Sequence, residues 1–480
     1  MSVSFEYVPA WRLAELVRAR EVSAAEVVED LVGRLDAPAA RELNTFTQVF
    51  PERALETARR VDRELADGGD PGALAGVPFT IKDLSPVEGT DTSFGSPAFA
   101  GSPSVGNAPV YERMAAAGGV FFAKTTTPEF GSKGTTESPL TGITRNPWDP
   151  ERTSGGSSGG AAAAVAAGLG PLAQGSDGGG SIRIPASFCG VVGLKPSAGR
   201  VPFLPEDSVF ETLTHHGPIA GCVRDATLML DAVAGPHPHD PFSLPAAPRS
   251  FLDAVAEPTA AAARPLRIAY SPDLGLGPVD PEVAALVEAA AGCFADRLGA
   301  AVEEARLDLG SYRDDMLVMW ATSLGYIADE LVAPRSPEAI DPALTELSHA
   351  ASRLEAIDYY RAAIVHRDEL YRTVADLFTG ADVLLTPTVA TAAFPHPGWH
   401  PGPAEVAGQA VDRRLGWIFT FPFNMTGSPA LSIPCGFTSA GLPVGLQLVG
   451  ARGEESVVLA AAAAYERANP WVDRHPEPAR

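Results

Sequence analysis

The chain has 480 residues, 45% of them hydrophobic and 20% charged, a composition that can bury the core of a large α/β domain. Its formal net charge of −23 argues against binding nucleic acid or anionic lipid through a basic surface. The four cysteines lack CxxC spacing, which argues against a zinc site or a disulfide framework and favours a cytoplasmic location.

The first part of the chain alternates predicted helices with apolar strands. Residues 1–68 are predicted to be helical, with a capping box at Ser23 and Glu26 and no signal-peptide leader. The run 72–84 is short and apolar and is bounded by glycine, proline and aspartate, so it predicts a buried strand. Residues 110–130 predict a helix, a strand and a polar loop. This alternation is typical of an α/β sheet covered by helices.

The second part continues this pattern after a Pro- and Ala-rich stretch at 236–265, which we interpret as a connection across the surface. Asp280 followed by Pro281 is a strong helix start. We predict helices over 280–299, most of 311–380 and 453–470, and strands near 266–272, 381–388 and 428–437. No apolar run reaches the roughly 18 residues of a membrane span, so no membrane-spanning helix is expected.

Two glycine-rich clusters lie close together in the middle of the chain. SGGSSGG at 154–160 runs into an alanine-rich stretch, and GSDGGGS follows at 175–181. Acyl transfer to a serine needs backbone N–H groups aimed at the oxyanion, and glycines allow consecutive N–H groups to point the same way. The second cluster therefore predicts an oxyanion hole that ends at its own nucleophile. A phosphate-binding loop is disfavoured because the adjacent lysine is absent.

A serine nucleophile needs a base, and the residues alone leave two candidates open. His215 and His216 lie near the clusters in sequence and could belong to a Ser-His-Asp arrangement, although such a pair is more often part of a polar loop. Lys82 lies in a mostly apolar run, and burial would favour its neutral, proton-accepting form. A lone lysine at that point is more often paired, here with Asp83.

Several segments resemble the amidase signature family. They are GVPFTIKDL, TTPEF, TRNPWD, SGGSSGGAAAAVAAG, GSDGGGSIRIPASFCGVVGLKPS and the closing FNMTGSPALSIPCGF and GLPVGLQLVG. Within the family, the sequence looks most like the bacterial 6-aminohexanoate-cyclic-dimer hydrolase type. The resemblance covers nearly the whole chain and implies an α/β fold with a large mixed central β-sheet covered by helices on both sides. It also implies one domain over 1–480, made of a helical region (1–68), a signature core (69–235), the surface connection (236–265) and the remaining sheet and pocket region (266–480).

The resemblance also implies a Ser–Ser–Lys triad. In this sequence Ser181 would be the nucleophile, Ser157 the bridging serine after a cis peptide bond, and Lys82 the base. The implied oxyanion and substrate-binding residues are Gly178, Gly179, Gly180, Gly131 and Ser132. The implied structural supports are Gly156, Ser158, Asp177 and Arg183. Gly178 departs from the family, where a larger residue is usual, so we expect a more flexible oxyanion loop or more room for substrate there.

The activity implied by the resemblance is hydrolysis of an amide through an acyl-enzyme, with no metal or cofactor. The expected partner is a small, aryl or oligomeric linear or cyclic amide, with carbamates and esters as further options, and a homodimer is common in the family. The alternatives are a glutamine-hydrolysing subunit of a tRNA-dependent amidotransferase and a non-catalytic binding module. The aromatic candidates for the pocket, each more often a core residue, are Trp320, Tyr326, Phe394, Trp399 and Trp417.

Overall fold

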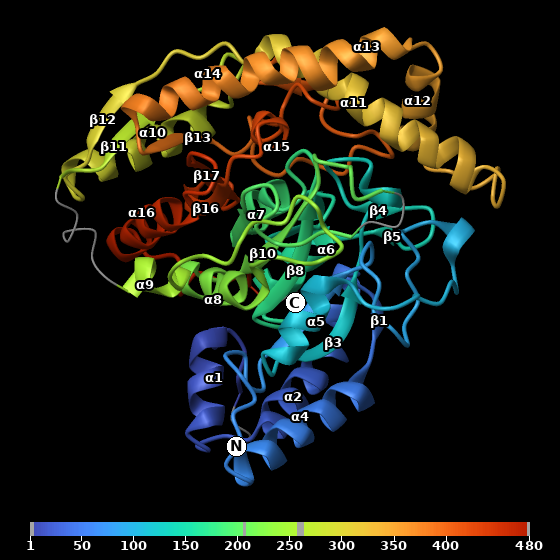
Figure 1. The fold of residues 1–480 in the computed structure, drawn as a ribbon, viewed down its shortest axis with the longest axis vertical. Coiled ribbons are helices and arrows are strands. Elements are labelled where there is room, and N and C mark those ends of the chain that lie inside the picture. Colours follow the sequence, from blue (N-terminus) through green and yellow to red (C-terminus); the bar gives the residue numbers. More distant parts are fainter. Residues whose placement is uncertain (1–3, 205–207, 257–263, 478–480) are drawn as a thin grey trace.

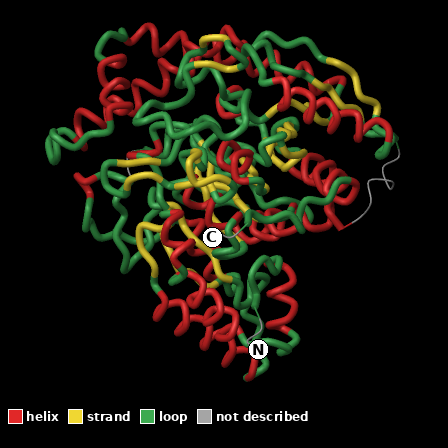
Figure 2. The backbone as a smooth tube through the Cα atoms, turned by 180° about the vertical axis from the view of Figure 1, so that it is seen from behind, coloured by secondary structure: helices red, strands yellow, loops and turns green. Residues whose placement is uncertain are grey.

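The computed structural model describes residues 4–204, 208–256 and 264–477. A mixed sheet of 11 strands organises the chain, in the order β1-β3-β2-β8-β10-β9-β16-β17-β13-β11-β12. Strands run through the middle of the molecule with helices around them, from the front (Figure 1) and from behind (Figure 2). The sheet contains β1 (Phe46–Val49), β2 (Pro78–Lys82), β3 (Val120–Thr125), β8 (Leu172–Asp177), β9 (Val192–Lys195), β10 (His215–Ala220), β11 (Arg267–Tyr270), β12 (Ala301–Glu304), β13 (Val383–Pro387), β16 (Ala430–Phe437) and β17 (Pro443–Val449).

The remaining elements are helices and short two-stranded pairings. The α-helices are α1 (Ala10–Arg18), α2 (Ala24–Leu35), α3 (Pro38–Leu43), α4 (Pro51–Ala66), α5 (Pro109–Ala116), α6 (Gly159–Ala166), α7 (Arg183–Cys189), α8 (Val223–Val233), α9 (Phe251–Ala256), α10 (Pro281–Asp296), α11 (Arg313–Tyr326), α12 (Pro342–Ala351), α13 (Ala356–Tyr360), α14 (Arg367–Gly380), α15 (Pro422–Met425) and α16 (Glu455–Ala468). Short 3-10 turns are η1 (Pro97–Phe99), η2 (Glu129–Gly131) and η4 (Gly310–Tyr312), and η5 (Ile327–Val332) and η6 (Arg361–His366) are π-helical. The small pairings join β4 (Glu137–Ser138) to β5 (Gly142–Ile143), β6 (Arg145–Asn146) to β7 (Asp149–Thr153) and β14 (Glu405–Val406) to β15 (Gln409–Ala410).

Several helices begin at residues that cap their first turn. Ser23 and Glu26 form the predicted capping box at the start of α2. Asp280 accepts hydrogen bonds from the N–H groups of Glu282 and Val283 at the start of α10. These side chains satisfy amide groups that have no partner within the helix, so the local sequence fixes where each helix begins.

Helices cover both faces of the sheet, because successive residues of a strand belong to different cores. On β13, Val383 and Leu385 pack into a core with α1, α2, α4, α5, α8, α10 and α16. Leu384 points to the other face, into a core shared with α7, α11 and α14. Side chains alternate across a strand, so a strand buried on both faces needs apolar residues at every position. The predicted fold class, a large mixed sheet with helices on both sides, is confirmed.

Two predicted regions differ from the structure in detail. Residues 1–68, predicted to be wholly helical, also contain strand β1, which pairs antiparallel with β3 from Phe46 to Val49. Four residues are too few to give a strand pattern, and a distant partner stabilises this one. The predicted connection 236–265 contains helix α9, whose first amides are held by Asp231, while residues 257–263 lie outside the described residues. Among the described helices, none is long and apolar enough to cross a membrane.

Candidate active site

The candidate site lies where β2 and β8 end. These neighbouring strands run parallel, so their carboxyl ends meet at one edge of the sheet. Lys82 is the last residue of β2, and Asp177 is the last residue of β8. Ser157 lies just before α6, and Ser181 lies just before α7. Two glycine-rich loops therefore bring their serines to the end of the strand that carries the lysine.

Lys82 is fully buried and is bonded to a serine. Its Nζ donates to Ser157 Oγ at 2.7 Å and to Ser176 Oγ at 3.0 Å. Its backbone N–H donates to the side-chain oxygen of Gln174 at 2.9 Å. Burial lowers the pKa of Lys82 to about 7, against the opposing effect of the Asp177 charge. A substantial fraction of this amine is therefore neutral near pH 7 and able to accept a proton from the hydroxyl that it contacts.

The two serine loops are tied together through Ser158. The peptide bond between Gly156 and Ser157 is cis. Ser158 N–H donates to the Ser181 carbonyl at 3.0 Å, and Ser158 Oγ donates to the Ser176 carbonyl at 3.1 Å. Ser157 and Ser181 line the same cavity of about 470 Å³, and within the described residues no hydrogen bond joins their hydroxyls. A proton relay between them would form when substrate binds, since such bonds are often long without it.

The glycine run before Ser181 offers backbone donors. Among the described residues, the N–H groups of Gly178, Gly179 and Ser181 have no acceptor, so they are available to an oxyanion. Gly180 differs from the prediction, because its N–H donates to Asp177 Oδ1 at 2.7 Å. A Cβ at Gly180 would overlap Thr420 Oγ1, so this glycine permits the turn and offers no free donor.

Of the two predicted substrate-binding residues Gly131 and Ser132, only Gly131 lines the cavity. Gly131 lines the cavity with φ +69°, and a Cβ there would lie 3.1 Å from Ser157 Oγ. Its N–H donates to the Pro128 carbonyl. Ser132 is buried and does not line the cavity; its carbonyl accepts from Arg414 at 2.9 Å. Gly131 therefore lies close to Ser157, whereas Ser132 lies outside the cavity lining and holds the turn through Arg414.

Asp177 and Arg183 form a buried pair that holds the nucleophile loop. Arg183 Nε and Nη2 donate to the two Asp177 oxygens at 2.9 Å each. Burial alone would raise the pKa of Asp177, but the charge and hydrogen bonds of Arg183 hold it below its usual value. Arg183 also donates to Gln447 Oε1 and Asn424 Oδ1, which come from the far end of the chain. These contacts agree with the supporting role predicted for this pair.

The two histidines are not bonded to the serines. Both lie in strand β10 and not in a loop, and they pair in register with Asp177 and Ser176 of β8. His215 Nδ1 lies 2.7 Å from the Leu213 carbonyl. Burial lowers the pKa of His216 to about 3, so its ring is neutral at pH 7 where it lines the cavity. Of the two candidate bases, the structure brings only Lys82 into contact with a predicted catalytic serine among the described residues.

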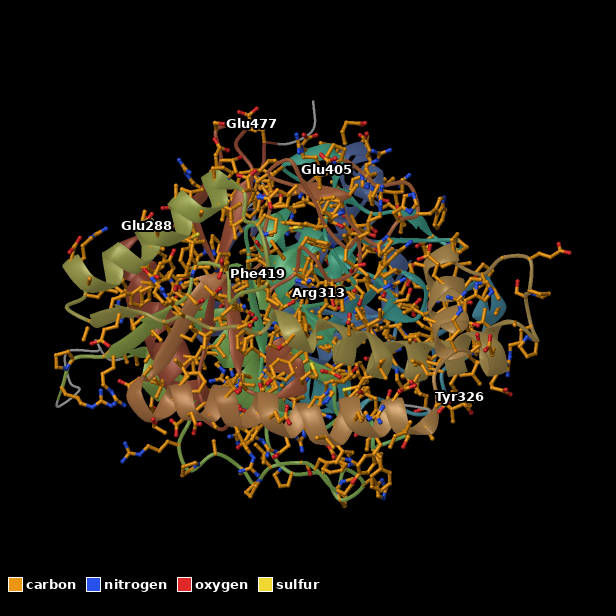
Figure 3. All side chains as sticks on the ribbon, turned by 90° about the horizontal axis from the view of Figure 1, so that it is seen from above. Glu288, Arg313, Tyr326, Glu405, Phe419 and Glu477 are labelled. Carbon is orange, nitrogen blue, oxygen red and sulfur yellow. The ribbon has the colours of Figure 1, made fainter. Side chains whose placement is uncertain are left out.

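The cavity has one aromatic wall. Phe94 and Phe130 stack with centroids 5.0 Å apart, and Phe99 meets both rings edge-on. Of the aromatic candidates from the sequence, Trp320 and Tyr326 also line the cavity. Tyr326 lies at the periphery of the molecule (Figure 3). The other aromatic candidates lie elsewhere: Phe394 and Trp417 pack with Phe188 in the core, and Trp399 covers Lys133.

The sequence analysis missed several residues of the site. Gln174 and Ser176 contact Lys82. They lie at alternate positions of β8, at the start of the second glycine cluster, and this spacing could have indicated one shared face. Thr420 and Asn424 reach the loop from more than 240 residues away, without a local signal. Within the described ranges, no group of three or more His, Cys, Asp or Glu side chains is arranged to hold a metal ion.

A buried lysine bonded to a serine, with a second serine beside free backbone N–H groups, defines the chemistry of a serine hydrolase. The sequence model of the Amidase family matches residues 26–459, and the chain belongs to this family. It is a hydrolase of carbon–nitrogen bonds in amides.

The relatives point in the same direction. The chain is 40% identical to an acylamidase of Rhodococcus erythropolis, over 98% of both chains. It is 36% identical to a 6-aminohexanoate-cyclic-dimer hydrolase of Paenarthrobacter ureafaciens, over 97% of this chain and 95% of the other. It is also 36% identical to one subunit of a glutamyl-tRNA(Gln) amidotransferase of Moorella thermoacetica, over 98% of both. Among solved structures, a bacterial aryl acylamidase superposes with a TM-score of 0.90 at 31% identity, over 97% of each chain.

Proposed function

We propose that the protein hydrolyses amides that carry a bulky apolar or aryl group, through an acyl-enzyme on Ser181. Neutral Lys82 accepts a proton from Ser157, and Ser157 accepts one from Ser181. The Ser181 oxygen attacks the amide carbon, and the oxyanion lies against the N–H groups of Gly178, Gly179 and Ser181. The relay then runs backwards, protonates the leaving nitrogen and breaks the carbon–nitrogen bond. Water hydrolyses the resulting ester and frees Ser181.

The observation that carries this proposal is the 2.7 Å hydrogen bond from buried Lys82 to Ser157, in the cavity that Ser181 also lines. The apolar preference is supported by the stacked rings of Phe94 and Phe130 beside the serines. The names of two relatives, acylamidase and aryl acylamidase, agree with it.

The competing function is release of ammonia from glutamine within an amidotransferase complex, an activity that the name of one relative suggests. Free glutamine carries an ammonium and a carboxylate, and its recognition needs charged partners inside the pocket. The cavity has an aromatic wall and two charged lining residues, Arg335 and Glu211. Both already have partners within the chain, because Arg335 packs over the Phe99 ring and the Glu211 carboxylate accepts hydrogen bonds from the Leu213 and Thr214 N–H groups. This lining favours an apolar amide.

The first experiment is labelling with a fluorophosphonate, followed by intact-mass analysis and peptide mapping. We expect a single adduct on Ser181 that is absent from Ser181→Ala, and a loss of amide turnover of about 10⁴-fold or more in that variant. Ser432→Ala is the matched control, because Ser432 is a buried serine whose hydroxyl lies 2.8 Å from that of Thr388, and it should label and turn over normally. An adduct elsewhere would overturn the nucleophile, and turnover of glutamine without turnover of anilides would favour the amidotransferase function.

The proposal takes residues 1–480 as one catalytic unit, because the sheet draws strands from Phe46 to Val449. One small-molecule amide is the partner it requires. A homodimer, which is common in the family, remains part of the proposal. We place the enzyme in the cytoplasm, in keeping with its four free cysteines.

A further inference from the structure

A cluster of buried charges lies behind the aromatic wall of the cavity. Lys133 Nζ pairs with Asp341 Oδ2 at 2.7 Å and with Glu137 Oε1 at 3.1 Å. Glu129 lies beside this pair and is itself fully buried. None of these four side chains lines the cavity, and none is needed for the proton relay. Because burying charge is costly, their presence calls for a function other than stability alone.

Glu129 joins three segments of the chain. One carboxylate oxygen accepts a hydrogen bond from Ser96 Oγ, and the other accepts from the Asp341 N–H at 2.6 Å. Asp341 in turn caps α12 through the Ala343 N–H at 2.9 Å. The carboxylate therefore connects the turn that follows β3 to the loop around η1 and to the residue that caps α12.

Two of the three segments carry part of the aromatic wall, and the third packs against it. Phe130 follows Glu129 directly, with φ +48°, and its ring stacks on Phe94. The loop that contains Ser96 places Phe99 edge-on to both rings. The α12 segment packs against α11, so that Leu344 and Leu347 share an apolar cluster with Phe130 and Trp320.

The turn that bears Phe130 also carries Gly131, beside Ser157. The 3.1 Å that would separate a Gly131 Cβ from Ser157 Oγ leaves little space between the turn and the relay. A shift of the turn would therefore move the aromatic wall relative to the serines. Glu129 is the one side chain described that bonds both to the 94–99 loop and to α12.

We propose that Glu129 is a positioning residue that holds the aromatic wall at a fixed distance from Ser181, and so sets the preference for amides with a bulky aryl or apolar group. The proposal rests on amide hydrolysis at Ser181. Glu129 does not touch the substrate; it acts through Phe130, Phe99 and the start of α12.

The test compares Glu129→Ala with Glu129→Gln on p-nitroacetanilide and on butyramide, a small amide without a ring. Alanine leaves the Asp341 N–H unpaired, so we expect KM for the anilide to rise about fivefold or more, with kcat and the butyramide kcat/KM changed less than about twofold. Glutamine has the same shape, and its carboxamide can accept from Asp341 N–H and donate to Ser96 Oγ, so it should restore the wild-type KM.

Asp225→Ala is the matched control. Asp225 is also a buried carboxylate with two acceptor contacts, to the Ala10 and Trp11 N–H groups at 2.8 and 2.9 Å, and none of its partners lines the catalytic cavity. We expect it to lower the melting temperature without changing the ratio of anilide to butyramide kcat/KM. A Glu129→Ala enzyme with a wild-type ratio, or a Glu129→Gln enzyme that behaves like alanine, would overturn the positioning role.

A second variant and a measurement on the wild type separate failure of this proposal from failure to fold and from failure of the proposed function. If Glu129→Ala does not fold, as judged by circular dichroism, Ser96→Ala removes one of the two contacts, and we expect the anilide KM to rise about twofold. An unchanged KM there would also count against the proposal. A wild-type enzyme that labels on Ser181 but hydrolyses neither amide would contradict the proposed function and not the role of Glu129.

Discussion

The segment from Thr153 to Cys189 and the helical region from Arg313 to Gly380 both contribute to the cavity, the second through α11 and η5, but they are built differently. Nearly every residue of the first segment is buried, including two serines and the Asp177–Arg183 pair. The helices have one solvent-exposed face, on which Tyr326 and Tyr360 are 56% and 55% exposed. The difference matches two roles. The first region keeps water away from a lysine that must be neutral, whereas the helical region has only to supply large side chains against an apolar substrate.

The two regions also differ in how closely their backbones pack. A Cβ at Gly160 would overlap Thr126 Oγ1, and one at Gly156 would lie 2.5 Å from the Thr135 carbonyl. In the helical region, shape comes from side chains such as Trp320 and Leu324. Changes at the catalytic or tightly packed positions of the first region should therefore greatly reduce turnover, and changes in the second should alter selectivity. The following substitutions test this separation.

Lys82→Met should have the largest effect, about a 10³-fold loss of kcat or more with the fold intact, because the base is removed and an apolar side chain of similar length takes its place. Lys195→Met is the matched control. Lys195 is also fully buried at the end of a strand, but its Nζ donates to the Pro196 carbonyl, whereas that of Lys82 donates to Ser157. Steady-state kinetics on an anilide would check both, and equal losses would contradict the assignment of Lys82.

The same lysine predicts the pH dependence of the wild type. Its pKa is lowered to about 7, and the relay needs the neutral amine, so protonation below that pH inactivates the enzyme. We expect kcat/KM to fall about tenfold per pH unit below pH 7 and to level off above it. His216 titrates far lower, with a pKa of about 3, and cannot produce this limb. A pH-independent profile between pH 5 and 8 would exclude Lys82 as the base.

Two glycines before Ser181 test, within one loop, whether close backbone packing determines the loss of turnover. Gly180→Ala would place a Cβ against Thr420 at φ +138°, so we expect a loss of kcat/KM of about 100-fold or more. In Gly178→Ala the new Cβ would lie 3.1 Å from Thr214 Oγ1, a contact that a small rotation of the threonine side chain relieves. Its kcat/KM should stay within about threefold of wild type. Kinetics and thermal melting of the two variants would show the contrast, and equal losses would mean that the loop tolerates no side chain at either position.

Much of the fold could be predicted from the sequence, because its signals are local. The run 72–84 contains β2, whose five residues are all buried, and the Asp280–Pro281 start begins α10 as predicted. Strand β1 could not be predicted, since its four residues gain their conformation from β3. A short segment that pairs with a distant strand has no periodicity of its own.

In the candidate site, too, contacts between segments that are distant in sequence could not be predicted. The glycine clusters indicate the serines and the backbone donors by composition alone. The contact from Asn424 to Asp177 cannot be read from either segment, because 247 residues separate the two. The family resemblance implies that Ser132 lies near the substrate, but after the left-handed turn at Phe130 and Gly131 this residue is buried and does not line the cavity. Sequence indicates which groups can act, and tertiary packing decides which of them face the cavity.

The smallest effect is expected from the helical wall. Trp320 is half-buried on α11 and lines the cavity close to Gly179. Trp320→Ala should raise KM for an anilide about two- to tenfold, because it removes the binding free energy of one aromatic contact. It should leave kcat and the hydrolysis of a small amide nearly unchanged. Trp11→Ala is the control, because Trp11 is also a half-buried tryptophan on a helix, packs against Arg224 and does not line the cavity. A large fall in kcat for Trp320→Ala would mean that the wall contributes to the chemical step, and the separation between the two regions would not hold.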